Sequence, residues 1–216
     1  TNGKHYYFFG IYPVLFAGGS VWIEQKLTGN WRWLAIAYTG WMLYTGFIRI
    51  PYGTPFLPIE QFAKYAGLEK NADGQLQGLT GDYADMFGWP EQVALVDSVY
   101  KSLSPEEQAR CLIWAENYGE AGAIQHLGKR YGLPAPVSKH GSFWLWGPGE
   151  NPGDIVISIG NETDDVNYFF AEVRLIQRIT HPYAIEEEQH IPLYLCRQPK
   201  IRLKEYWPQW RDHVFD

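Results

Sequence analysis

The stretch from Arg110 to Tyr131, RCLIWAENYGEAGAIQHLGKRY, contains the sharpest change of hydrophobic period in the chain. Its first part is apolar without interruption from Cys111 to Ala115, which is typical of a strand buried on both faces. Polar Glu116 and Asn117 end this run. Beyond Gly119 the apolar residues return with helical spacing, at Ala123, Ile124 and Leu127. This order predicts a buried strand, a turn and a helix, which is half of a βαβ unit.

Other segments extend this unit into a sheet with helices. Periodicity predicts strands at residues 142–146, 154–159, 173–179 and 191–196, and helices at 59–66, 89–103 and 162–170. We therefore expect an α/β fold whose sheet is mostly parallel and flanked by helices. The turn from Glu116 to Glu120 would lie at the carboxyl end of the first strand, where open α/β sheets usually bind ligands.

Two uncharged or nearly uncharged stretches precede this region. Tyr6–Ile23 is close to the length of a membrane-spanning helix, and Trp31–Ile50 is a second candidate with Trp and Tyr near its ends. Together they predict a transmembrane helical hairpin. Lys26 and Arg32 beside its short turn would place that turn in the cytoplasm. The alternative is that both stretches are core elements of a large soluble domain.

The chain therefore divides into three predicted parts. Residues 1–50 form the transmembrane hairpin, residues 51–80 a linker rich in Pro and Gly with one short helix, and residues 81–216 the α/β domain. The chain carries a net charge of -6, and only its first 50 residues are basic. An acidic domain argues against a nucleic-acid partner, because phosphate binding needs a basic face.

Candidate binding residues gather in two segments of the α/β domain. Glu116, Asn117, Tyr118 and Glu120 on the first turn suit polar recognition, although such turns are polar in any case. The second group consists of His140, Trp144 and Trp146. The two tryptophan rings could stack against sugar rings or could serve only core packing, and His140 could take part in the site or could make only structural hydrogen bonds. No segment has the spacing of a metal site, a dinucleotide fingerprint or a phosphate loop.

Cys111 and Cys196 are the only cysteines, and each lies in an apolar run. We expect two buried thiols that behave as small hydrophobic side chains, with a disulfide as the alternative.

Several segments together resemble a known family. They are the KHYY start at residues 4–7, ADMFGW at 84–89, NYGEAGAI at 117–124, RYGLP at 130–134, HGSFWLWGP at 140–148 and HPYAIEEEQHIPLYLCR at 181–197. In this order, after two hydrophobic stretches and a Pro-rich linker, they resemble the carboxyl-terminal part of bacterial membrane glycosyltransferases. These enzymes belong to the dolichyl-phosphate-mannose protein mannosyltransferase-like superfamily and are related to the aminoarabinose transferases.

The resemblance implies an enzyme of the cell inner membrane. Such enzymes move a sugar from a polyprenyl-phosphate carrier to an extracytoplasmic acceptor, with the lipid-linked sugar as donor and no other cofactor. Their catalytic carboxylate lies in an early loop, so the chain would supply late spans and an extracytoplasmic accessory domain, with no catalytic residue of its own. Its partners would be the bilayer, the carrier and the rest of the enzyme.

The resemblance also places the carrier phosphate. It would lie near Lys4, Tyr6 and Tyr7, because a Lys at the lipid interface suits a phosphodiester. Acceptor or sugar binding would fall to the Glu116 turn and to the segment from His140 to Trp146. The competing interpretation is a soluble α/β ligand-binding or interaction domain without catalysis.

Overall fold

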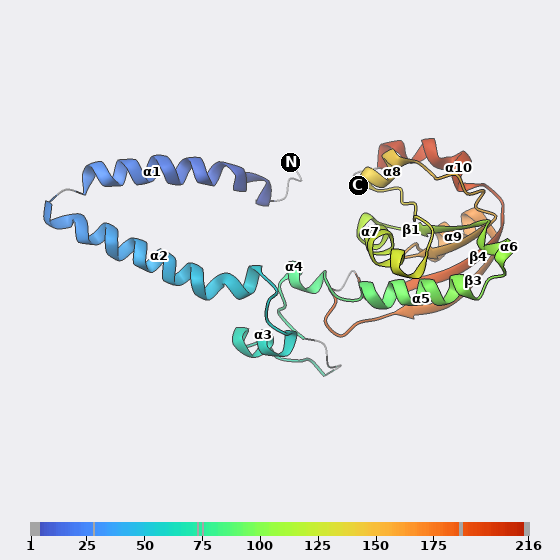
Figure 1. Cartoon of the computed structure of the whole chain (residues 1–216), viewed down its shortest axis with the longest axis horizontal. Coiled ribbons are helices and arrows are strands. Elements are labelled where there is room, and N and C mark those ends of the chain that lie inside the picture. The colour runs from blue at the N-terminus through green and yellow to red at the C-terminus, as the bar shows by residue number, and fades with distance from the viewer. Residues whose placement is uncertain (1–4, 28, 73, 75, 186–187, 214–216) are drawn as a thin grey trace. The chain divides into compact units, whose positions relative to one another are not determined.

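Two units make up the chain in the computed structural model, residues 1–62 and residues 63–216 (Figure 1). The structure describes residues 5–27, 29–72, 74, 76–185 and 188–213. We call residues 1–62 the helical unit and residues 63–216 the α/β unit.

The helical unit is built from two long helical segments. The first consists of the 3-10 helix η1 (His5–Ile11) and α1 (Tyr12–Lys26), and the second of η2 (Gly29–Trp31) and α2 (Arg32–Gly53). Pro13 stands in the first turn of α1, where its missing N–H costs no helical hydrogen bond. Neither helix is packed into a core, since α1 has no buried residue and α2 buries only Pro51.

The predicted transmembrane hairpin is wrong in this structure. Within the described residues, none of the helices combines the length and the apolar character needed to cross a membrane. The α-helical part of the first segment has 15 residues, or roughly 22 Å at 1.5 Å per residue, against a hydrocarbon layer about 30 Å thick. The second helix has 22 residues, but Arg32, Arg49 and many Trp, Tyr, Thr and Gly residues lower its mean hydropathy.

The α/β unit contains ten further helices among the described residues, the first of which crosses the boundary between the units. They are α3 (Ile59–Ala66), α4 (Gly81–Ala84), α5 (Trp89–Lys101), α6 (Pro105–Gln108), α7 (Tyr118–Leu127), α8 (Gly141–Trp146), α9 (Thr163–Phe169), α10 (Leu203–Tyr206), and the 3-10 helix η5 (Trp207–His213), with η3 (Gly128–Tyr131) continuing α7. The helices predicted at residues 59–66, 89–103 and 162–170 are confirmed with small changes at their ends.

The sheet has four strands, β1 (Cys111–Ala115), β2 (Ile155–Ile159), β3 (Phe170–Ile179) and β4 (Ile191–Pro199), in the order β1-β2-β4-β3. Only β1 and β2 are parallel, and both pairings of β4 are antiparallel. The prediction of a mostly parallel sheet is therefore wrong. Residues 180–190 join β3 to β4, which is fewer than the dozen or more residues that a parallel crossover needs, and the two strands pair antiparallel.

The strand predicted at residues 142–146 is also wrong, because this segment forms α8. Two glycines with positive φ, Gly141 at 57° and Gly147 at 88°, bound the helix. Phe143 points into the core while Leu145 and Trp146 are exposed. A five-residue apolar run fits a helix or a strand equally well, and here the flanking glycines favour the short helix.

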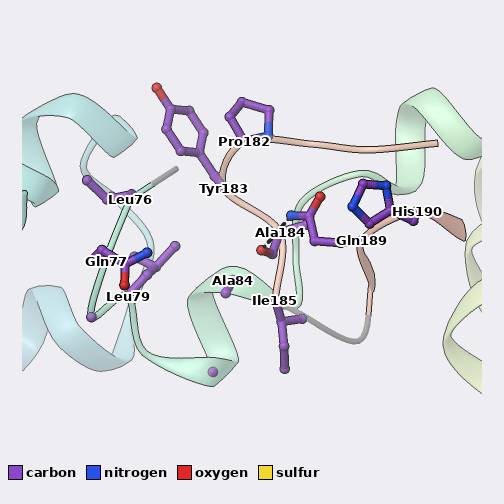
Figure 2. A pocket seen from close by; sticks show the side chains of 12 residues that line it. Leu76, Gln77, Leu79, Ala84, Pro182, Tyr183, Ala184, Ile185, Gln189 and His190 are labelled. Carbon is purple, nitrogen blue, oxygen red and sulfur yellow. Dashed lines mark hydrogen bonds between the residues drawn. The ribbon is translucent and has the colours of Figure 1, made fainter. Parts of the chain in front are cut away.

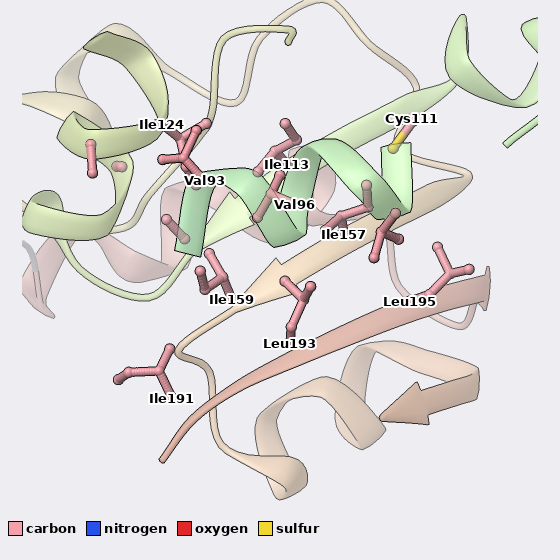
Figure 3. Close-up of a cluster of buried hydrophobic side chains, with 14 of the residues drawn as sticks. Val93, Val96, Cys111, Ile113, Ile124, Ile157, Ile159, Ile191, Leu193 and Leu195 are labelled. Atoms are coloured by element: carbon pink, nitrogen blue, oxygen red, sulfur yellow. The ribbon is translucent and has the colours of Figure 1, made fainter. Parts of the chain in front are cut away.

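Apolar side chains cover both faces of the sheet. On one face Ile113 and Ile157 pack beneath α5 and α7, with Val93 and Ile124 from those helices (Figure 3). On the other face the core joins Trp114 of β1 to residues of α9, α10 and η5.

The two cysteines lie in different layers of this core, Cys111 on the α5 face and Cys196 on the other. Both are free, as expected, and burial raises the pKa of each thiol to about 12.

Candidate functional site

The carboxyl ends of the two parallel strands collect polar residues from five segments of the α/β unit. The turn from Glu116 follows β1, and Gly160 and Asn161 follow β2. Val137 runs beside Trp114 as a parallel bridge, which brings the segment after it to the same edge. The start of α5 and the residues before β4 complete the group, as the contact of Gln92 with Glu188 shows. We call this region the carboxyl edge.

A reciprocal cap fixes the turn after β1. Asn117 Oδ1 accepts hydrogen bonds from the backbone N–H of Gly119 at 2.8 Å and of Glu120 at 3.0 Å. Glu120 Oε2 in turn accepts from the backbone N–H of Glu116 at 3.0 Å and of Asn117 at 3.3 Å. This capping box satisfies the free N–H groups that begin α7. Asn117 and Glu120, both predicted as ligand-binding residues, therefore form the frame of the turn.

Glu120 is almost completely buried, with 1% of its surface exposed. Its carboxylate lies so close to Gly160 that a Cβ there would overlap it, and Gly160 has a φ of 79°. Burial, followed by the nearby carboxylate of Glu188, raises the pKa of Glu120 well above its ordinary value. The site thus favours the protonated form of this side chain.

A second buried carboxyl group belongs to Glu188, which is 9% exposed. Gln92 Nε2 donates a hydrogen bond to Glu188 Oε2 at 3.0 Å. Burial raises the pKa of Glu188, and the neighbouring carboxylates of Asp85 and Glu116 add to the rise, while hydrogen bonds from Gln92 and Asn117 oppose it. Glu188 therefore belongs to the same acidic cluster as Glu120.

Several buried oxygens of this cluster lack a partner. Within the described part of the chain, Glu120 Oε1, Gln92 Oε1 and Asn161 Oδ1 have no hydrogen bond. The amide nitrogen of Asn161 is fully used, since it donates to Ser158 Oγ at 3.0 Å and to the carbonyl oxygens of Trp114 and Ile159. Gln92 Oε1 and Asn161 Oδ1 are thus buried acceptors without a donor among the described residues, whereas the carboxyl group of Glu120 can itself donate when it is protonated.

The accessible part of the edge is formed by Glu116 and Lys139. Their side chains are 30% and 21% exposed, and Lys139 Nζ lies 3.5 Å from Glu116 Oε1. Ser138 Oγ donates to the carbonyl oxygen of Glu116 at 3.1 Å and accepts from the backbone N–H of His140 at 3.2 Å. The structure thus brings His140 next to the Glu116 turn, although the two lie more than 20 residues apart in the sequence.

The predicted aromatic residues have different environments. Tyr118 and Trp146 are mostly exposed, at 66% and 65%. Trp144 is instead held in the core layer of η5, because its indole N–H donates to the carbonyl oxygen of Trp207 and that of Trp207 donates to the carbonyl oxygen of Trp144, both at 3.1 Å. Only Tyr118 and Trp146 therefore offer free ring surface.

The predicted carrier-phosphate residues can be described only in part. Lys4 lies outside the described residues, and Tyr6 and Tyr7 belong to η1 by their backbone, while their side chains are not among those described.

Sequence reasoning missed Gln92 and Glu188. Glu188 stands in EEEQH at residues 186–190, which its charges predict to be a solvated acidic run, and for Glu188 this prediction is wrong because its side chain is buried. Its position three residues before β4 was the available signal, because that places it at the sheet edge. Gln92 gives no such signal, because it lies in α5, a helix whose amphipathic pattern does not set this residue apart from its neighbours.

Metal binding finds no support at this edge. Among the described residues, no group of His, Cys, Asp or Glu side chains has an arrangement that could hold a metal ion. Comparison of the chain with family models, curated protein sequences and solved structures gave no match.

Proposed function

We propose that this chain is the trailing part of a glycosyltransferase that takes a sugar from a polyprenyl-phosphate carrier, and that its α/β unit binds the acceptor at the carboxyl edge. The supporting observation is that segments carrying the family resemblance meet there. The ring of Phe87, in the segment 84–89, stacks on His181, in the segment 181–197, with centroids 5.2 Å apart, and the carboxyl groups of Glu188 and of Glu120, in the segment 117–124, are close enough to raise the pKa of Glu120. Residues separated by about 90 positions thus build one surface.

The chemistry of the edge suits a saccharide. Glu116 and Lys139 present an acceptor and a donor at partly exposed positions, and sugar hydroxyl groups can pair with both. The exposed rings of Tyr118 and Trp146 provide flat apolar surfaces for the C–H faces of a sugar. Buried Glu120 and Glu188 serve to fix the turn that carries Glu116, Glu120 by accepting from the backbone N–H of Glu116 and Glu188 by its hydrogen bond with Asn117.

The exposed side chains of the helical unit support the proposal of a partner with an apolar surface. Large apolar side chains are exposed along both helices, among them Phe16 at 63%, Trp41 at 63% and Phe47 at 74%. Trp and Tyr are favoured where lipid meets water. We propose that this unit contacts the bilayer of the inner membrane, that the α/β unit lies on its extracytoplasmic side, and that Lys4 pairs with the carrier phosphate near Tyr6 and Tyr7.

The carrier part of the proposal is tested by flotation of the full chain with phosphatidylcholine vesicles, with and without a polyprenyl phosphate. We expect binding to both vesicles and stronger binding when the polyprenyl phosphate is present. Lys4→Ala should remove the increment and leave the basal binding, whereas Lys204→Ala, at an exposed position of α10, should leave both. Equal binding to the two vesicles by the unmodified chain would refute the carrier role.

The acceptor part is tested by saturation-transfer NMR with a panel of neutral and charged oligosaccharides. Glu116→Gln and Trp146→Ala should each weaken binding about tenfold, the loss of roughly one good polar or ring contact. Glu150→Gln and Tyr168→Ala are matched controls, because both residues are exposed and lie on other segments. Undiminished binding in both edge variants, or no binding of any oligosaccharide, would refute the acceptor site.

A further inference from the structure

A pocket of about 880 Å³ lies in the α/β unit between residues 76–84 on one side and residues 182–185, 189 and 190 on the other (Figure 2). Among the described residues that line it, none is Asp, Glu, Lys or Arg. Its apolar lining includes Leu79, Ile185 and the ring of Tyr183, and its polar side chains are Gln77, Gln189 and His190. The volume lies in the range typical of small-molecule sites, which is about 300–1,000 Å³.

One wall of this pocket is braced from within by Gln189. Its Nε2 donates to the carbonyl oxygens of His181 at 2.6 Å and Ala184 at 2.9 Å, and its Oε1 accepts from the backbone N–H of His181 at 3.3 Å. The ring of Phe87 packs against both His181 and Tyr183. The wall is therefore formed without a ligand, which reduces the ordering cost of binding.

His190 occupies an unusual position in the same wall. Its φ of 59° is rare for a residue other than glycine, and the anchored neighbours on either side hold it there. Glu188 is fixed by Gln92, and Ile191 begins β4 opposite Ile179. The imidazole is exposed and makes no hydrogen bond with any other described residue. A strained backbone that presents an unused polar ring to a pocket is a feature of binding sites.

We propose that this pocket binds a neutral sugar ring of the acceptor, an inference that rests on the proposed function and names a second contact for its substrate. A charged ligand is disfavoured because none of the described lining side chains carries a charge, and the nearby ammonium of Lys70 already lies against the ring of Tyr183 at 5.6 Å from its centroid. The Gln77 amide and the His190 imidazole can donate and accept hydrogen bonds, as sugar hydroxyl groups do, whereas both N–H groups of Gln189 are used within the wall. Leu79, Ile185 and Tyr183 supply apolar surface for the C–H face of the ring.

The test uses the full chain and saturation-transfer NMR with methyl α-glucoside, methyl α-mannoside and methyl α-galactoside as probes. Methyl α-glucuronide and methyl α-glucosaminide are the charged counterparts. At least one neutral glycoside should bind, and the charged ones should bind more weakly. Gln77→Ala and His190→Gly should each reduce affinity about tenfold, as expected for one lost polar contact. Glycine at residue 190 suits the positive φ, so the fold is retained.

Two matched variants control for general effects. His126→Ala changes an exposed histidine of α7, and Gln209→Ala an exposed glutamine of η5, and neither residue lines the pocket. Both should bind the neutral glycoside as the unmodified chain does. Circular dichroism of every variant confirms that the fold is intact.

Three results would overturn the pocket assignment. They are the absence of binding by all three neutral glycosides, full affinity in the Gln77→Ala/His190→Gly double variant, and tighter binding of a charged glycoside than of its neutral parent. If the double variant binds normally while Glu116→Gln and Trp146→Ala weaken oligosaccharide binding, the pocket is excluded and the carboxyl edge stands. If the double variant alone loses binding, the pocket stands and the edge site fails.

Discussion

The two units of this chain use apolar side chains in opposite ways. In the α/β unit the apolar residues of the strands pack on both faces of one sheet, beneath helices that cover each face, and Figure 3 shows the cluster on the face of α5 and α7. In the helical unit, α1 and α2 expose their large apolar side chains over most of their surface. Apolar composition alone therefore does not decide burial. A sheet supplies two broad faces to cover, whereas each of these helices needs a surface from elsewhere.

The largest expected effect compares one tryptophan from each unit. Trp114 is 1% exposed and packs against Trp210 and Phe169, with ring centroids 5.7 and 5.5 Å apart. Trp114→Ala should lower the free energy of unfolding of the α/β unit by about 3–5 kcal/mol, the usual cost of emptying a buried aromatic site. Trp41→Ala, at a residue 63% exposed on α2, should change it by less than about 0.5 kcal/mol.

Urea unfolding followed by far-ultraviolet circular dichroism measures both values in the same detergent solution. A loss below about 1 kcal/mol in Trp114→Ala would contradict the core described for this face of the sheet. An equally large loss in Trp41→Ala would remove the contrast between the units.

A glycine from each unit gives the next largest contrast. Gly160 has a φ of 79° and adjoins the buried Glu120 carboxylate, so Gly160→Ala combines backbone strain with a steric overlap. We expect a loss of about 2–4 kcal/mol in the free energy of unfolding. Gly18→Ala on α1 meets no atom within 4 Å and should be neutral, or should stabilise the helix by up to about 1 kcal/mol. The same urea titration measures both variants, and equal effects would argue against the close contact of Gly160 with Glu120.

The smallest expected effect concerns the pH dependence of the α/β unit. Because the pKa of Glu120 is raised in the folded state, the folded chain binds more protons than the unfolded chain between the ordinary value of 4.5 and the raised value. The free energy of unfolding should therefore fall as the pH rises from 5 to 8. Glu120→Gln cannot titrate and should reduce this fall.

Glu188 has a pKa raised in the same direction and Glu116 lies nearby, so part of the pH dependence remains in the variant. Glu150→Gln, at an exposed position, is the matched control and should follow the unmodified chain. Urea midpoints at pH 5, 6, 7 and 8 measure the difference. An unchanged slope in Glu120→Gln would show that burial of this carboxyl group is not linked to stability.

Much of the α/β unit could be predicted from local patterns. The apolar run of β1, the capping box of Asn117 and Glu120, and the helices α3, α5 and α9 follow from residues that are neighbours in the sequence. The segment at residues 142–146 was assigned incorrectly because its apolar run is too short to distinguish a helix from a strand. The parallel sheet was assigned incorrectly because strand order depends on long-range pairing, and β4 pairs between β2 and β3.

The residues of the candidate site likewise divide into those that could be named from the sequence and those that could not. Glu116, Asn117, Tyr118 and Glu120 could be named from the sequence because they share one turn after a recognisable strand. Gln92 could not, because its importance arises from a contact with Glu188 across 96 positions of the chain. The position of Glu188 before β4 places it at the sheet edge, but its burial follows only from the tertiary structure. The pocket beside His190 likewise exists only after two distant segments come together.

The sequence by itself determined the four strands, the helices α3, α5, α7 and α9 and the turn at the end of β1, because hydrophobic period, glycine and capping residues act over a few neighbouring positions. Only the tertiary structure decided the strand order, the burial of Glu120 and Glu188, and the exposure of α1 and α2. Burial and pKa depend on which surfaces meet in space, and that is set by packing between distant segments.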